Sequence, residues 1–209
     1  MSKYRYRTIE EQLRLRFVVK NSRFIATAAP VEDVGGAEQF VESIRAEFPD
    51  ATHHTYAYRI GAGSSLVERA FDDREPAGTA GLPMLQLLQG KGLSDLVVVG
   101  TRYFGGIKLG IGGLTRAYRH CARVCYEEAV LLERERLYHC RMIVTYGDIG
   151  PLLRQLEALG AEIIATDYGA EVSVTAALPY RNAAIMQKRF AGLTRGSGRW
   201  EPLEGPPGQ

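Results

Sequence analysis

The order of secondary-structure signals after residue 136 constrains the fold of this chain more than any other feature. The sequence predicts strands at 137–146, 161–168 and 171–178, the last two around a turn at Gly169, and helices at 151–160 and 182–193. A short strand near Trp200 completes the series. This β-α-β-β-α-β order is the signature of a ferredoxin-like split unit. We therefore predict a ferredoxin-like domain at 137–203, followed by a disordered tail at 204–209.

The first 134 residues predict a separate domain of mixed strands and helices. The charged segment Glu-Arg-Glu-Arg at 133–136 marks the predicted boundary, and the whole chain is predicted to be α+β with an N-terminal domain at 1–134. Gly90 is the predicted C-terminal stop of the second helix. The expected strands are 13–19, 24–31, 52–60, 66–71 and 96–104, and the expected helices are 37–48, 82–90 and 114–132.

Composition excludes several classes of protein. The three cysteines, Cys121, Cys125 and Cys140, are too few for a disulfide framework. No apolar run reaches membrane-spanning length and no apolar signal core follows the basic N-terminus, so we expect a cytoplasmic protein without a membrane partner. No metal-ligand spacing or phosphate-binding motif is present, and no cofactor is predicted. Because the net charge is only +2, any recognition of anions has to be local.

The segment Arg-Tyr-Phe-Gly-Gly-Ile-Lys-Leu-Gly-Ile-Gly-Gly, residues 102–113, is the strongest candidate for such recognition. It lies between a predicted strand and a predicted helix, which places free N–H groups at a helix N-terminus, where anions bind. The alternative is that the glycines allow positive φ and close packing while the arginines only solvate the helix. We favour anion or nucleic-acid binding by Arg102, Gly105, Gly106, Lys108, Gly110, Gly112, Gly113, Arg116, Arg119 and Arg123.

A second candidate is the acidic loop with Asp72, Asp73 and Glu75. Three carboxylates bind magnesium or move protons in many enzymes. They also cap turns or pair with cations such as Arg102, and the capping role is the commoner one.

Three further residues, His54, Thr79 and Tyr103, are candidates for lining a groove between these loops. The neighbouring His53 and His54 should face opposite sides of a strand and cannot share one metal ion. The sequence therefore predicts no catalytic residue and no metal ligand.

Four stretches of the N-terminal half of the sequence resemble the IMPACT family in its bacterial YigZ-like branch. They are Asn-Ser-Arg-Phe-Ile at 21–25, Thr-His-His-Thr-Tyr at 52–56, Asp-Asp-Arg-Glu-Pro at 72–76, and residues 97–122. The resemblance implies an N-terminal fold like the second domain of a small-subunit ribosomal protein and a ferredoxin-like second domain. It also implies relatives in eukaryotes that regulate translation. The family pattern has Gly at the position of Arg74. Since Arg tolerates positive φ poorly, the loop should differ in backbone or be more cationic.

These observations predict a non-enzymatic, translation-associated regulatory protein that binds RNA or the ribosome through its basic, glycine-rich surface. The partners would be RNA, the ribosome or a protein of the translation machinery. An enzyme acting on a phosphorylated small molecule is one alternative, with Asp72, Asp73 or Glu75 in the reaction and Lys108 on the phosphate. A protein-interaction module is the other.

Overall fold

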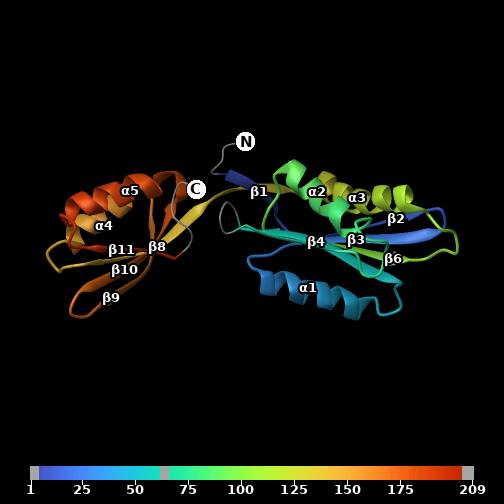
Figure 1. Ribbon diagram of the computed structural model, residues 1–209, viewed down its shortest axis with the longest axis horizontal. Helices are drawn as coiled ribbons and strands as arrows, with labels where there is room; N and C mark the ends of the chain where they lie inside the picture. The colour runs from blue at the N-terminus through green and yellow to red at the C-terminus, as the bar shows by residue number, and fades with distance from the viewer. Residues whose placement is uncertain (1–4, 62–65, 204–209) are drawn as a thin grey trace. The chain divides into compact units, whose positions relative to one another are not determined.

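The computed structural model describes residues 5–61 and 66–203, so the tail predicted at 204–209 lies outside the described residues. The described residues divide into two compact units, one holding 6–61 and 66–134 and the other holding 135–203 (Figure 1). Within the described ranges, each helix is too short or too polar to span a lipid bilayer.

The N-terminal unit is built on one antiparallel sheet with the strand order β2-β3-β6-β4-β5. Its long central strands, β3 and β6, carry small and β-branched side chains that are buried on both faces of the sheet. The sheet strands are β2 (Leu13–Val19), β3 (Ser22–Pro30), β4 (His53–Ile60), β5 (Val67–Phe71) and β6 (Leu96–Tyr103).

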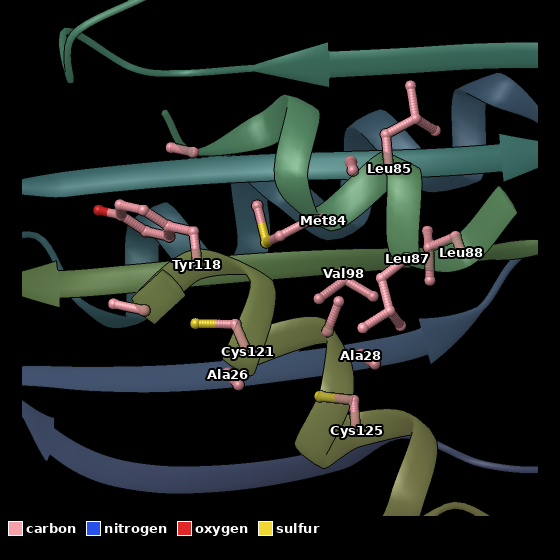
Figure 2. Close-up of a cluster of buried hydrophobic side chains, with 14 of the residues drawn as sticks. Ala26, Ala28, Met84, Leu85, Leu87, Leu88, Val98, Tyr118, Cys121 and Cys125 are labelled. Atoms are coloured by element: carbon pink, nitrogen blue, oxygen red, sulfur yellow. The ribbon is translucent and has the colours of Figure 1, made fainter. Parts of the chain in front are cut away.

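Helices cover both faces of this sheet (Figure 1). Helix α1 (Val34–Glu47) packs on β4 and β6 on one face, whereas α2 (Gly81–Lys91) and α3 (Ile111–Glu128) pack together on the other. Figure 2 shows the second layer, in which Met84, Leu88 and Cys121 lie over small residues of the strands. The thiols are free and buried, and burial raises the pKa of Cys125 to about 12.

The end of the third helix differs from the prediction. Helix α3 begins at Ile111 and ends at Glu128, and the chain then forms β7 (Leu131–Glu135), which pairs with β1 (Arg5–Ile9). Both strands of this ribbon are short and charged, so apolar periodicity did not reveal them.

The end of the second helix also differs. Gly90 lies inside α2, and Gly92 takes the left-handed conformation that stops the helix, with φ at 63°. The N–H of Gly92 donates to the carbonyl of Gln89 in this stop.

The C-terminal unit confirms the ferredoxin-like prediction. Its antiparallel sheet has the order β11-β8-β10-β9, in which the first strand of the unit lies between the fourth and the third. Both helices pack over the buried face of this sheet (Figure 1). The elements are β8 (Leu137–Val144), α4 (Ile149–Ala158), β9 (Glu162–Tyr168), β10 (Val172–Pro179), α5 (Tyr180–Leu193) and β11 (Arg199–Pro202). The chain is thus α+β, as the sequence predicts.

Candidate functional site

The glycine-rich segment connects the end of β6 to the start of α3. Gly105 lies so close to the β2–β3 turn that a Cβ atom there would be 2.1 Å from the carbonyl oxygen of Asn21. Gly110, immediately before α3, has φ at 72°, a conformation that L side chains rarely adopt. These glycines therefore have structural reasons to be present, in agreement with the alternative weighed from the sequence.

The N–H groups of this segment differ in their partners. Those of Phe104 and Gly105 donate to the hydroxyl oxygens of Thr52, at 3.0 Å, and Ser22, at 3.3 Å. From 106 to 113, no N–H group has a main-chain or side-chain acceptor among the described residues. Free N–H groups over the first turn of α3 give this end of the helix a positive partial charge.

The arginines of α3 extend this positive surface. Arg116, Arg119 and Arg123 are all exposed, while the residues between them on the inner side of the helix are buried. None of the three, nor the exposed Lys108, forms an ion pair with any residue that the structure describes. The spacing predicted from the sequence therefore produces a row of unneutralised cations on one side of α3.

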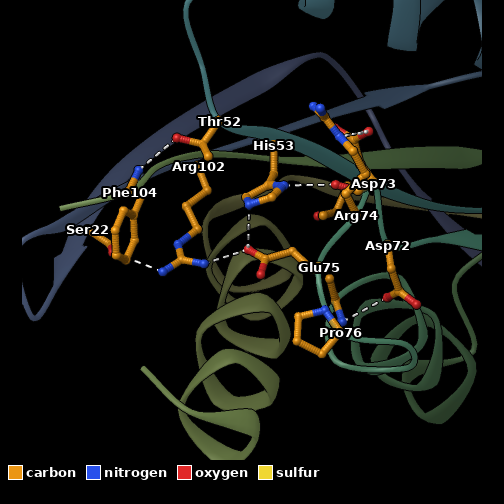
Figure 3. A network of polar contacts seen from close by, with 12 residues as sticks. Ser22, Thr52, His53, Asp72, Asp73, Arg74, Glu75, Pro76, Arg102 and Phe104 are labelled. Atoms are coloured by element: carbon orange, nitrogen blue, oxygen red, sulfur yellow. Dashed lines mark hydrogen bonds and ion pairs between the residues drawn. The ribbon is translucent and has the colours of Figure 1, made fainter. Parts of the chain in front are cut away.

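Arg102 is not part of this surface, which corrects the prediction for that residue. The residue is 4% exposed, and its side chain is buried, with Nη1 donating to Glu75 Oε1 at 2.6 Å and Nη2 donating to the hydroxyl of Ser22 at 3.2 Å (Figure 3). The direction follows from the pleat of β6, because Arg102 pairs with Phe24 and His53 on the face that α3 covers.

Glu75 is the centre of this buried polar network. Its Oε1 also accepts a hydrogen bond from the hydroxyl of Tyr118 at 2.7 Å, and His53 Nε2 lies 3.8 Å away. His53 is held by its other ring nitrogen, since Nδ1–H donates to the carbonyl of Asp73 at 2.8 Å. Burial, followed by the charge of Glu75, raises the pKa of Tyr118 far above its usual range, so the phenol stays protonated. The network ties the acidic loop, β4, β6 and α3 together.

Asp72 has a capping role. One carboxylate oxygen accepts the N–H groups of Ala80 and Gly81, each at 2.9 Å, and the other accepts that of Gly78 at 2.7 Å. These bonds fix the start of α2. No group of three or more His, Cys, Asp or Glu side chains within the described ranges is placed to hold a metal ion.

The acidic loop keeps a left-handed backbone at two consecutive residues, with φ at 41° for Asp73 and 67° for Arg74. Arg74 therefore adopts the conformation that favours Gly, and its side chain is 81% exposed. A non-glycine residue in this region costs roughly 1–2 kcal/mol.

We expect Arg74→Gly to raise the free energy of unfolding by roughly 0.5–1 kcal/mol, because relief of this strain outweighs the added freedom of the unfolded chain. Urea unfolding of both proteins measures the difference. Arg74→Ala is the control, because it removes the same charge but keeps the strain and should give no gain. A less stable glycine variant would contradict the strain argument.

The predicted groove is not formed. The side chains of His54 and Thr79 are both buried, and the Thr79 hydroxyl donates to the carbonyl of Pro76 at 2.7 Å. His54 faces the α1 side, where Nε2–H donates to the carbonyl of Phe48 at 3.0 Å and burial lowers its pKa. His53 faces the opposite side, as the strand pattern predicts. Tyr103 lines a pocket that lies on the α1 face of the sheet.

Sequence reasoning missed two basic residues of that pocket, Arg16 and Arg23. The sequence of β2 could have revealed them, because Arg14 and Arg16 alternate with apolar residues and so share the face of the strand opposite its apolar side chains. Alternation was used to identify the apolar face of the strand, and no role was predicted for the basic face.

Comparisons with known proteins agree across both units. Residues 20–126 match the "Impact N-terminal domain" family, and residues 142–197 match a "Domain of unknown function (DUF1949)". The chain is 38% identical to "IMPACT family member YigZ" of Escherichia coli over 180 residues, covering 86% of this chain and 88% of that protein. It is 39% identical to "IMPACT family member YvyE" of Bacillus subtilis over 161 residues, covering 76% and 74% of the two chains.

A solved crystal structure described as that of "an hypothetical protein" has 34% identity and a TM-score of 0.73, and the match covers 97% of this chain and 99% of the other. Sequence and structure thus agree over both domains, and the chain belongs to the IMPACT family.

Proposed function

We propose that this protein is a translation-associated regulator that binds RNA, free or in the ribosome, through the α3 surface. We define the α3 surface as Lys108, Arg116, Arg119, Arg123 and the N–H groups of 106–113. One observation carries the proposal. The exposed cations, which have no carboxylate partner among the described residues, lie next to the free N–H groups at the N-terminus of α3. Both features attract phosphate groups. The chain belongs to the IMPACT family, and its resemblance to that family implies eukaryotic relatives that regulate translation. This supports a role in translation.

The acidic loop supports a structural role over an enzymatic one. The Asp72 carboxylate already accepts three N–H groups, and Glu75 is paired with Arg102 and Tyr118. A carboxylate that binds magnesium or transfers a proton has to face its substrate, whereas the Glu75 side chain is only 4% exposed. The enzyme alternative therefore has less support than RNA binding.

Apolar side chains around the segment favour a second candidate, a protein-interaction surface. Phe104, Ile107 and Ile111 are 46%, 47% and 69% exposed, close to Lys108 in the sequence. In an RNA complex these groups would contact bases or sugars, whereas in a protein complex they would form the apolar centre of the interface. Replacing Ile107 and Ile111 by Ala distinguishes the two candidate functions, because the affinity for RNA should change little if contacts to phosphates dominate RNA binding.

The test of RNA binding compares salt dependence in matched variants. Wild-type affinity for a single-stranded RNA should fall steeply with salt, because bound phosphates release counterions. Replacing Arg116, Arg119 and Arg123 by Glu should weaken binding by tenfold or more at about 0.1 M salt and reduce the salt slope by about 2. Fluorescence anisotropy over a salt series measures both quantities.

The control places the same charge change in the other unit. Arg141, Arg154 and Lys188 are exposed and have no ion pair within the described residues, so their replacement by Glu preserves the net charge of the first variant. Equal loss of affinity in the two variants would attribute binding to overall charge and remove the α3 surface from the proposal.

A further inference from the structure

A pocket of about 440 Å³ opens on the α1 face of the N-terminal sheet, the face opposite α3. Its volume is within the range of small-molecule sites, about 300–1,000 Å³. It lies at the end of β6 that leads into the glycine-rich segment. The lining residues are Arg16, Phe17, Val18, Arg23, Phe24, Ile25, Phe48, Asp50 and Tyr103.

The position of α1 leaves this pocket uncovered. The helix packs on β4 and β6, and it ends at Phe48, which forms part of the pocket lining. Strand register places Val18 opposite Arg23, and Arg23 opposite Tyr103, so the three side chains share one face. Val18 is 65% exposed, which indicates that nothing in the described chain covers this end of the sheet.

The charges of the pocket favour an anion. Arg16 and Arg23 are exposed and form no ion pair with a described residue, whereas the neighbouring Arg14 is neutralised by Glu47 through two contacts of 2.5 and 2.6 Å. Asp50 is the acid in the lining, and one of its oxygens accepts the hydroxyl of Tyr103 at 2.9 Å. Two guanidinium groups and one carboxylate leave a net positive site.

The pocket also presents flat surfaces. The Arg23 guanidinium stacks on the Tyr103 ring, 4.6 Å from its centre, and Arg14, which is outside the pocket lining, stacks on the Phe48 ring, 5.0 Å from its centre. Aromatic rings and guanidinium planes are the groups on which proteins stack unpaired nucleobases. A ligand that combines a phosphate with a flat ring therefore matches the pocket better than a simple anion.

We propose that this pocket binds one unpaired nucleotide of a single-stranded RNA, with the base against Tyr103 or Phe48 and the phosphate on Arg16 and Arg23. This inference rests on the proposed function and deepens it. Tyr103 ends β6 within the glycine-rich segment, just before the free amides of 106–113, so an RNA strand on those amides would reach the pocket around the end of the sheet. The α3 surface would hold phosphates of any sequence, and the pocket would select an unstacked base.

The test uses 2-aminopurine riboside 5′-monophosphate, whose fluorescence is quenched when its ring stacks. Wild-type protein should quench the probe, and Tyr103→Leu with Phe48→Leu should weaken its binding about fivefold or more, since base stacking contributes at least that factor. Arg16→Gln with Arg23→Gln should weaken it comparably through the phosphate. Arg141→Gln with Arg154→Gln is the control of equal charge, and circular dichroism confirms that each variant is folded.

A second arm separates this proposal from the function on which it rests. An RNA oligonucleotide should bind more tightly than its abasic counterpart, and the pocket variants should abolish that difference while the α3 variant weakens both ligands equally. No quenching, together with equal affinity for the two oligonucleotides, would overturn the pocket and leave salt-dependent RNA binding intact. Quenching without RNA binding would overturn the assignment to RNA and, with it, the proposed function.

Discussion

Replacing Glu75 by Gln is expected to lower the free energy of unfolding by about 3–5 kcal/mol. The substitution leaves the Arg102 guanidinium charged, 4% exposed and without its carboxylate, and an unpaired buried charge is far more costly than an exposed one. The same change weakens the hydrogen bond from Tyr118, whose hydroxyl shares the oxygen Glu75 Oε1. Urea denaturation at neutral pH measures the loss.

Two comparisons isolate the cause of that loss. Glu38→Gln breaks the Arg69–Glu38 pair, whose side chains are 50% and 52% exposed, and should cost no more than about 1 kcal/mol. The double variant Glu75→Leu with Arg102→Met removes both charges and should be more stable than Glu75→Gln. If Glu75→Gln costs as little as Glu38→Gln, the buried pair does not stabilise the fold as argued.

Gly105→Ala is expected to destabilise the N-terminal unit by about 3 kcal/mol, at the upper end of the usual cost of overpacking. The new Cβ would be 2.1 Å from the carbonyl oxygen of Asn21 and 2.6 Å from the backbone nitrogen of Ser22. Both atoms are main chain in the β2–β3 turn, so relief requires the turn and the glycine-rich segment to move apart. The midpoint temperature of thermal unfolding and the affinity for RNA should therefore both fall.

Gly90→Ala is the matched control for that substitution. Gly90 lies inside α2, and a Cβ there meets no atom within 4 Å. Alanine at this position should raise stability by about 0.5–1 kcal/mol, because glycine is the poorer helix former. A similar loss in both variants would mean that the close approach at Gly105 is not the cause.

Periodicity was sufficient to predict most of the fold. The apolar alternation of β8 and β10 and the helical spacing of α4 and α5 reveal the ferredoxin-like unit, because each of these elements buries one face. Strand β9 is exposed along almost its whole length. The ribbon of β1 and β7 escaped prediction because its residues are mostly charged or half-buried. Local pattern also placed the stop of α2 at Gly90, two residues before the left-handed Gly92.

The candidate site was less predictable because its contacts join residues far apart in sequence. Arg102 and Glu75 are 27 residues apart, and only the pairing of β6 with β3 and β4 turns the guanidinium toward α3. The sequence spacing of Arg116, Arg119 and Arg123, by contrast, was enough to place them on one side of a helix. Proximity across strands depends on register, which a single sequence specifies weakly.

The pairing of β1 with β7 has a consequence for synthesis of the chain. The first strand of the N-terminal unit, Arg5–Ile9, pairs with Leu131–Glu135, more than a hundred residues later in the sequence. Contacts between residues so far apart in sequence form late in folding. A nascent polypeptide leaving the ribosomal tunnel can therefore assemble the central sheet early, and its first strand can already bond the main chain of Gly92 and Ser94. That strand nevertheless lacks its partner β7 until translation has passed residue 135.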